Sequence, residues 1–168
     1  MLKILIPVDG SELALDAVQH GLRLVREGLQ ASFVIANVQA PASLYEMVLA
    51  PDPHVLQDVS DGAGAHLLEP ARALLAAAGL SCELEVASGD PAHTLIDIVE
   101  RYACDAIIMG AHGGGAVRNA LLGSVSQAVI HASPVPVTLI KHVPADETPA
   151  QVLAEAQAEP EGQASDAG

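Results

Sequence analysis

The sequence predicts a single-domain α/β fold, a Rossmann-like, doubly wound and mostly parallel sheet of five strands with helices on both faces. The first observation is that five short apolar segments alternate with segments of helical periodicity or long crossovers. Strands joined by such crossovers run parallel, and right-handed crossovers place helices on both faces. The second observation is size, because 168 residues with 51% hydrophobic content suit one domain with an ample core.

The first half of the chain predicts two strands and two helices. The apolar run "LKILIPV" at 2–8 ends in the turn "DGS", where Ser11 is a candidate N-cap for the first helix. The segment "ASFVIANV" at 31–38 predicts the second strand, and the stretch at 39–53, rich in proline and alanine, predicts a long loop. An Ala/Leu-rich helix is expected at 54–78, and the glycines of "DGAGA" weaken its first turns.

The second half continues the alternation. The segment "SCELEVAS" at 81–88 alternates in polarity and predicts the third strand. Asp90 as N-cap and Pro91 at the first helical position begin a helix that runs to about Ala103. The remaining elements are a strand at 105–110, a helix at 124–131 and a strand at 134–140.

Composition excludes several classes of partner. A net charge of −14 opposes binding to nucleic acids and anionic membranes, and 2% aromatic residues leave few rings for base stacking. No apolar run reaches the ~20 residues that span a bilayer. The N-terminal "MLKILIPVDGS" is too short and too soon polar for a signal peptide, so a cytoplasmic protein is expected. Cys82 and Cys104 show no ligand spacing and are expected to be reduced thiols.

The composition changes near residue 144. Residues 144–168 are rich in Ala, Glu, Gln, Pro and Gly and contain no Lys or Arg. Six acidic residues lie in this segment: Asp146, Glu147, Glu155, Glu159, Glu161 and Asp166. Such a segment cannot bury enough apolar surface to form a core, so we expect a domain at 1–143 followed by an acidic, disordered tail.

The most informative segment is "GAHGGGAVRNALLGS" at 110–124, with five glycines between an expected strand and an expected helix. In an open parallel sheet, ligands bind beyond the carboxyl ends of the strands, where the winding reverses. The turns "VDGS" and "VQAP" share this edge. Glycine permits close approach of the backbone to a ligand, and exposed N–H groups at a helix N-terminus attract anions. The pattern predicts an anion-binding loop to which Ser124 and Ser126 add hydroxyl groups.

Two common phosphate-binding motifs do not fit this loop. The chain has no Gly-Lys pair for GxxxxGK[ST], and a GxGxxG pattern from Gly113 would place its last glycine on Arg118. The observed spacing, Gly110-x2-Gly113-x9-Gly123-Ser124, resembles the pattern G-x2-G-x9-G-[ST] of the universal stress protein (UspA) family. The blocks "ILIPVDGSELA", "GDPAHTLIDIVERYACDAIIMGAHG" and "LLGSVSQAVIHASPVPVTLI" also resemble that family, so that only the tail lies outside the resemblance.

The resemblance implies the strand order 3-2-1-4-5. In the ATP-binding branch of the family it further implies a nucleotide site at the ends of the first and fourth strands, with ATP bound with or without Mg²⁺. Asp9 is then expected to hold the ribose beside Pro7 and Val8, and the Val38 backbone to meet the adenine edge. The phosphate side is expected to include Met109, Gly110, His112, Gly113, Gly123, Ser124, Val125 and Ser126.

The resemblance also implies a dimeric stress-response regulator rather than an enzyme. The last strand, about Val135–Ile140, is expected at a sheet edge, and the resemblance implies a homodimer built by its antiparallel pairing with a second copy. The chain has no GxSxG motif and no evident catalytic lysine, so slow ATP hydrolysis is the most that is expected. The seven histidines form no HxxxH or HExxH pair, so no metal site is expected.

Other interpretations of these residues stay open. Asp9 and Ser124 are also good caps for the helices that follow them. A second hypothesis is the same fold without nucleotide binding, acting through protein contacts. It is favoured by the net acidity and by Gly114, at a position where many members of the family carry a cation. A third hypothesis is a slow ATPase.

Overall fold

The computed structural model describes residues 1–39, 53–113 and 122–141. The expected tail, most of the expected loop at 39–53, and Gly114 and Arg118 therefore lie outside the described residues. The elements run in the order β1 (Leu2–Pro7), α1 (Glu12–Arg26), β2 (Ala31–Gln39), α3 (Pro53–Ala77), β3 (Cys82–Ser88), α4 (Pro91–Tyr102), β4 (Ala106–Gly110), α5 (Ser124–Ala132) and β5 (Val137–Ile140).

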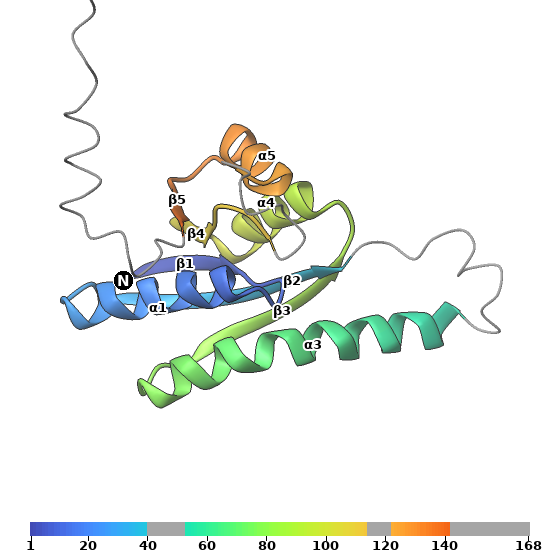
Figure 1. The fold of residues 1–168 in the computed structure, drawn as a ribbon, viewed down its shortest axis with the longest axis horizontal. Coiled ribbons are helices and arrows are strands. Elements are labelled where there is room, and N and C mark those ends of the chain that lie inside the picture. Colours follow the sequence, from blue (N-terminus) through green and yellow to red (C-terminus); the bar gives the residue numbers. More distant parts are fainter. Residues whose placement is uncertain (40–52, 114–121, 142–168) are drawn as a thin grey trace, which may run out of the picture.

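The strands form one parallel sheet in the order β3-β2-β1-β4-β5, which confirms the predicted fold class and strand order (Figure 1). β1 lies at the centre, between β2 and β4. The winding reverses at β1, because the chain first builds outward through β2 and β3 and then returns to add β4 and β5. The crevice between the carboxyl ends of β1 and β4 is the place where such sheets bind ligands.

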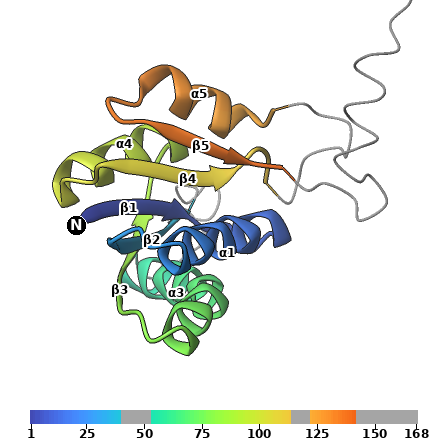
Figure 2. The same cartoon turned by 90° about the vertical axis from the view of Figure 1, so that its left-hand side faces the viewer.

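The helices form two layers around the sheet (Figure 2). α1 and α3 cover one face and bury Ala17, Phe33 and Leu75 in one core, whereas α4 and α5 cover the other face and bury Ile98 and Val129 in a second core. Both cores are built mainly from aliphatic side chains, as the composition predicts. Because both faces are covered, the central strands are apolar without alternation.

Capping residues account for the starts of two helices. The Ser11 hydroxyl accepts a hydrogen bond from the Ala14 N–H at 3.2 Å, and the Asp90 carboxylate accepts one from the His93 N–H at 3.0 Å. Both caps confirm the sequence-based prediction. The interpretation of Ser124 as a cap is wrong, because Gly123 is the N-cap of α5 and makes no side-chain hydrogen bond.

Two boundaries differ from the sequence-based prediction. The last strand begins at Val137 rather than at residue 134, because Pro134 and Pro136 have no N–H to donate to a sheet ladder. The Pro136 carbonyl still accepts a hydrogen bond from the Ile107 N–H at 2.9 Å. The long helix runs from Pro53 to Ala77, one residue earlier at each end than predicted.

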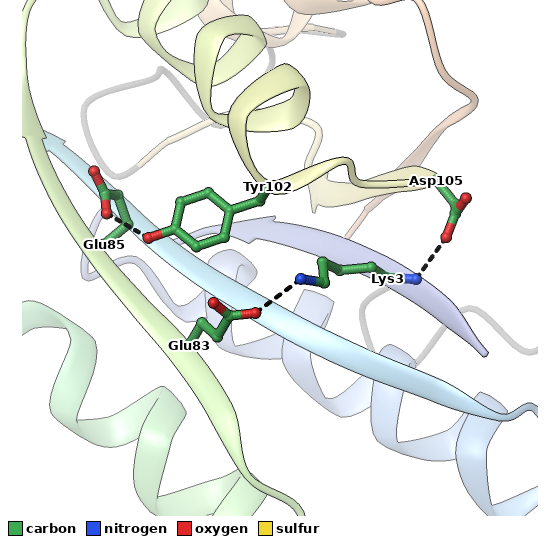
Figure 3. Close-up of polar contacts among 5 residues, drawn as sticks. All are labelled: Lys3, Glu83, Glu85, Tyr102 and Asp105. Carbon is green, nitrogen blue, oxygen red and sulfur yellow. Dashed lines mark hydrogen bonds and ion pairs between the residues drawn. The ribbon is translucent and has the colours of Figure 1, made fainter.

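A polar network links the amino ends of β1 and β4 to β3 and to the end of α4 (Figure 3). The Lys3 main-chain N–H donates to Asp105 at 2.8 Å, and the Lys3 ammonium pairs with Glu83 at 2.9 Å. The Tyr102 hydroxyl donates to Glu85 at 2.7 Å, and this hydrogen bond raises the pKa of Tyr102. The network joins β1, β3 and the end of α4. It lies toward the amino ends of the strands, whereas the crevice lies at their carboxyl ends.

Two further expectations concern the cysteines and the membrane. Cys82 and Cys104 are both free thiols, and burial raises the pKa of each. Within the described residues, the structure contains no helix that is long and apolar enough to cross a membrane.

The glycines of "DGAGA" lie inside α3, and one of them permits a close helix–sheet contact. A Cβ atom at Gly64 would lie 2.5 Å from Val86 Cγ1 and 3.1 Å from Asn37 Oδ1, so the helix touches the sheet where Gly64 has no side chain. A Cβ atom at Gly62 would meet nothing within 4 Å. Gly64 lowers the helix propensity of this segment, but the close packing of α3 on the sheet requires a glycine there.

We expect Gly64→Ala to destabilise the protein by about 1–2 kcal/mol, because overpacking against β2 and β3 outweighs the gain in helix propensity. Gly62→Ala in the same helix should instead stabilise it by up to about 1 kcal/mol, since its added methyl group meets no neighbour. Urea unfolding of both variants measures the difference. Stabilisation by both alanines would contradict the close approach at Gly64.

Candidate functional site

A cavity of about 390 Å³ opens at the carboxyl ends of β1, β2 and β4. The N-termini of α4 and α5 complete its wall. All twelve residues that the family resemblance implies line this one cavity: Pro7, Val8, Asp9, Val38, Met109, Gly110, His112, Gly113, Gly123, Ser124, Val125 and Ser126. Residues more than 110 positions apart in the chain thus meet at the crevice where the winding of the sheet reverses.

Asp9 is the second residue after the end of β1 and follows Val8. Its Oδ1 accepts a hydrogen bond from the Ser11 N–H at 3.0 Å, and Gly10 between them adopts φ +83°. A residue with a side chain would be strained at this angle, so glycine is needed for the turn. The carboxylate is therefore directed by the local turn, and Ser11 rather than Asp9 caps α1 through its side chain.

Asp9 reaches across the crevice to the glycine loop. A Cβ atom at Gly113 would lie 2.5 Å from Asp9 Oδ2, so no side chain fits at residue 113 while the carboxylate keeps its position. The second glycine of the pattern thus leaves the Asp9 carboxylate in its place beside the loop.

The two described ends of the glycine loop lie against each other. The Gly123 N–H donates to the Ala111 carbonyl at 2.8 Å, and the Ala111 N–H donates to the Ile140 carbonyl at 2.8 Å. A Cβ atom at Gly123 would lie 3.1 Å from His112 Cα, which is close for any side chain. The loop therefore leaves β4 and returns to α5 at almost the same point, and this brings the α5 N-terminus to the cavity.

The start of α5 supplies hydrogen-bond donors. Gly123 caps the helix without a side-chain contact, and the first N–H groups, from Ser124 onward, have no acceptor within the helix. These groups and the helix dipole favour an anion at this end of the cavity. The Ser126 hydroxyl donates instead to the Gly110 carbonyl at 3.0 Å, and Ser126 is only 3% exposed. Ser126 thus joins α5 to the end of β4.

The opposite end of the cavity is apolar. It is lined by residues that the sequence-based analysis did not include, namely Ala36 of β2 and Pro91 and Leu95 of α4. Ala36 and Val38 lie on the same face of β2, since they are two residues apart in a strand. The two-residue repeat of a strand could have indicated Ala36 from Val38. The approach of α4 to the cavity could not be seen in the sequence, because it depends on packing between distant segments. Ser11, Ala14 and Asn37 also line the cavity and were not predicted.

The electrostatics of the cavity depend on the backbone. None of the described lining residues is Lys or Arg, so the described groups that can attract an anion are backbone N–H groups and the start of α5, whereas Asp9 adds a negative charge. In the described part of the chain, no group of three or more His, Cys, Asp or Glu side chains is placed to hold a metal ion. The described lining thus offers apolar contacts beside β2, a carboxylate that accepts hydrogen bonds at Asp9, and backbone donors at the start of α5.

Comparisons with known proteins agree with this fold. The universal stress protein family model matches residues 1–141. Universal stress protein YxiE of Bacillus subtilis is 29% identical over 147 residues, covering 83% of this chain and 98% of that protein.

Solved structures give the same result. The hypothetical protein MJ0577 has a TM-score of 0.73 at 26% identity, covering 84% of this chain and 96% of that one. A universal stress protein family protein from Arabidopsis thaliana with AMP bound has a TM-score of 0.62 at 24% identity, covering 89% of this chain and 97% of that one. Together with the match to the family model, which spans most of the sequence, these findings mean that this chain belongs to the universal stress protein family.

Proposed function

We propose that the cavity binds an adenine nucleotide, with ATP as the first candidate, and that the bound nucleotide acts as a signal in a cytoplasmic stress-response regulator. The observation that carries the proposal is the order of chemistry along one cavity. The neighbouring strands β2, β1 and β4 bring to it, in that order, apolar residues of β2 with α4, the Asp9 carboxylate after β1, and the glycine loop with the α5 N-terminus after β4. A base, a ribose and phosphates follow one another in the same order. The family protein solved with AMP bound has the same fold.

Each part of the nucleotide has a proposed partner. The adenine ring lies between Val38 and the apolar residues of α4, with its polar edge toward the Val38 backbone. The Asp9 carboxylate accepts hydrogen bonds from the ribose hydroxyl groups. The phosphates lie against the N–H groups at Gly113 and at the start of α5, where Ser124 adds a hydroxyl group.

The proposal assigns binding rather than catalysis to this site. Because the donors are mainly uncharged N–H groups, affinity for a highly charged phosphate chain is expected to be moderate, and Mg²⁺ would lower the charge that the loop has to accommodate. Hydrolysis of ATP, if measured, should be slow. A signalling role then requires that binding of the nucleotide change the conformation of a protein surface. It does not require that the nucleotide be hydrolysed.

We expect nucleotide-stripped protein to bind ATP with Mg²⁺ in the micromolar range, as measured by isothermal titration calorimetry. Gly113→Val should weaken binding at least about tenfold, because its side chain would occupy the position of Asp9 Oδ2. Asp9→Asn should weaken binding less, since it keeps the shape of the side chain and loses the charge.

Gly62→Ala serves as the control for glycine substitution, because Gly62 is exposed on α3 and does not line the cavity. It should bind ATP as the wild type does. No binding of ATP, ADP or AMP by the wild type up to millimolar concentration would contradict the proposal and favour a family member that acts through protein contacts alone.

We further propose a homodimer through the last strand, about Val135–Ile140. β5 is the terminal strand of the sheet and pairs with β4 on one side. Its partly exposed apolar residues, such as Val137 and Leu139, suit pairing with another strand. Antiparallel pairing of two copies would extend the sheet across both subunits.

Sedimentation equilibrium should give about twice the chain mass of 17.2 kDa. Thr138→Asp should weaken dimerisation at least about tenfold, because pairing of the short β5 strands brings two carboxylates close together. Thr138→Ser, which adds no charge, is the control and should remain a dimer. A wild type that sediments as a 17.2 kDa species at all concentrations would contradict the dimer.

A further inference from the structure

Asn37 is a buried polar residue that the proposed nucleotide contacts leave without a role. It lies in β2 and is 3% exposed. Its Nδ2 donates a hydrogen bond to the Val8 carbonyl at 2.6 Å, and its Oδ1 accepts one from Gln39 Nε2. Buried polar groups are retained where they are hydrogen-bonded, and here the two bonds fix both ends of the amide.

The bond to Val8 lies where the pairing of β1 and β2 ends. The register of the two strands runs from Leu2 to Pro7, and the Val8 N–H then donates to the Ala36 carbonyl at 2.8 Å. The Asn37 side chain donates to the carbonyl group of the same residue, Val8. Val8 is therefore attached to β2 through both its N–H and its C=O, one residue beyond the end of the strand.

Asp9 follows directly on this attachment. Its peptide bond is formed by the Val8 carbonyl carbon, so a shift of that carbonyl moves the Asp9 backbone. The Ser11 N–H holds Oδ1 of the carboxylate, and Oδ2 lies close to Gly113. A displacement of about 0.5 Å is enough to spoil the geometry of a designed polar contact. Asn37 thus holds the backbone group that precedes Asp9, and the turn to Ser11 orients the carboxylate from there.

We propose that Asn37 is the positioning residue of Asp9 and thereby determines selectivity for a ribonucleotide over a 2′-deoxyribonucleotide. The inference rests on the proposed function, because it assigns the ribose hydroxyl groups to Asp9. Asn37 acts from the α3 side of the sheet, where Gly64 leaves room for its Oδ1. Its amide fixes the Val8 carbonyl, this carbonyl fixes the backbone of Asp9, and the Asp9 carboxylate binds the ribose hydroxyl groups.

A purely structural role for Asn37 makes a different prediction. In that case its loss would lower stability and would weaken the binding of ATP and of 2′-deoxyATP by the same factor. The ratio of the two dissociation constants separates the roles, because the two ligands differ only in the hydroxyl group that Asp9 is proposed to recognise. Stability alone does not change this ratio.

The experiment compares the affinities of ATP and 2′-deoxyATP for four proteins by calorimetry: wild type, Asp9→Asn, Asn37→Leu and Phe33→Leu. Asn37→Leu keeps much of the volume of the side chain and removes its donor. Phe33→Leu is the matched control, because Phe33 is a buried residue of the same strand that does not line the cavity. It lowers stability through lost packing alone.

We expect the wild type to prefer ATP about tenfold, and both Asp9→Asn and Asn37→Leu to reduce the preference to about twofold or less. Phe33→Leu should keep the wild-type ratio. If Asn37→Leu does not fold, Gln39→Leu, which removes the partner of Asn37 Oδ1, should lower the preference to a smaller extent. Asn37→His, which can restore a donor, should recover part of the preference.

The outcomes distinguish this inference from the proposed function. A wild type that prefers ATP, together with Asn37 and Gln39 variants that keep the full preference, would overturn the inference and leave nucleotide binding intact. A wild type that binds neither ligand would overturn both. A wild type that binds both equally would overturn the inference together with the assignment of the ribose to Asp9.

Discussion

The site depends on one close approach, in which the Asp9 carboxylate reaches Gly113 across the crevice between β1 and β4. A Cβ atom at residue 113 would lie 2.5 Å from Asp9 Oδ2 and would displace the carboxylate, so glycine there keeps this approach. The turn that directs the carboxylate needs the positive φ of Gly10. Two glycines, one on each side of the crevice, therefore let the first and fourth strands form a common site. The α5 N-terminus is then brought to the same place by the hydrogen bond from Gly123 to Ala111.

The position of the carboxylate is supported from the opposite face of the sheet. Asn37 attaches Val8 to β2, and α3 packs over Asn37 at Gly64. At the amino end of β1, the polar network around Lys3 joins this strand to Asp105 and to Glu83 of β3. The end of β1 is thus held by neighbouring strands rather than by a free loop, which is the condition under which a small polar group can be held accurately enough to select a ligand.

Local signals in the sequence were enough to predict much of the fold and the site. Alternating apolar and helical segments predicted the sheet, since each element carries its own periodicity. The glycine spacing alone predicted an anion-binding loop, and the family resemblance that it revealed implied the twelve residues that line the cavity. The roles of Asn37 and Gly64 could not be predicted, because each depends on a contact between residues far apart in the chain. Asn37 looks like an interruption of an apolar strand until Val8 is seen beside it. The misplaced start of the last strand has a local cause, namely the prolines at 134 and 136.

The central claim is that an adenine nucleotide occupies the cavity between β1 and β4. The most direct test is to titrate ¹⁵N-labelled protein with ATP and Mg²⁺ and to follow the backbone amide resonances by NMR. We expect the largest shifts at Val38, Asp9, Gly113 and Ser124, which surround the cavity from three strands and a helix. Resonances that do not move up to millimolar nucleotide, or that move only at residues away from the cavity, would contradict the account.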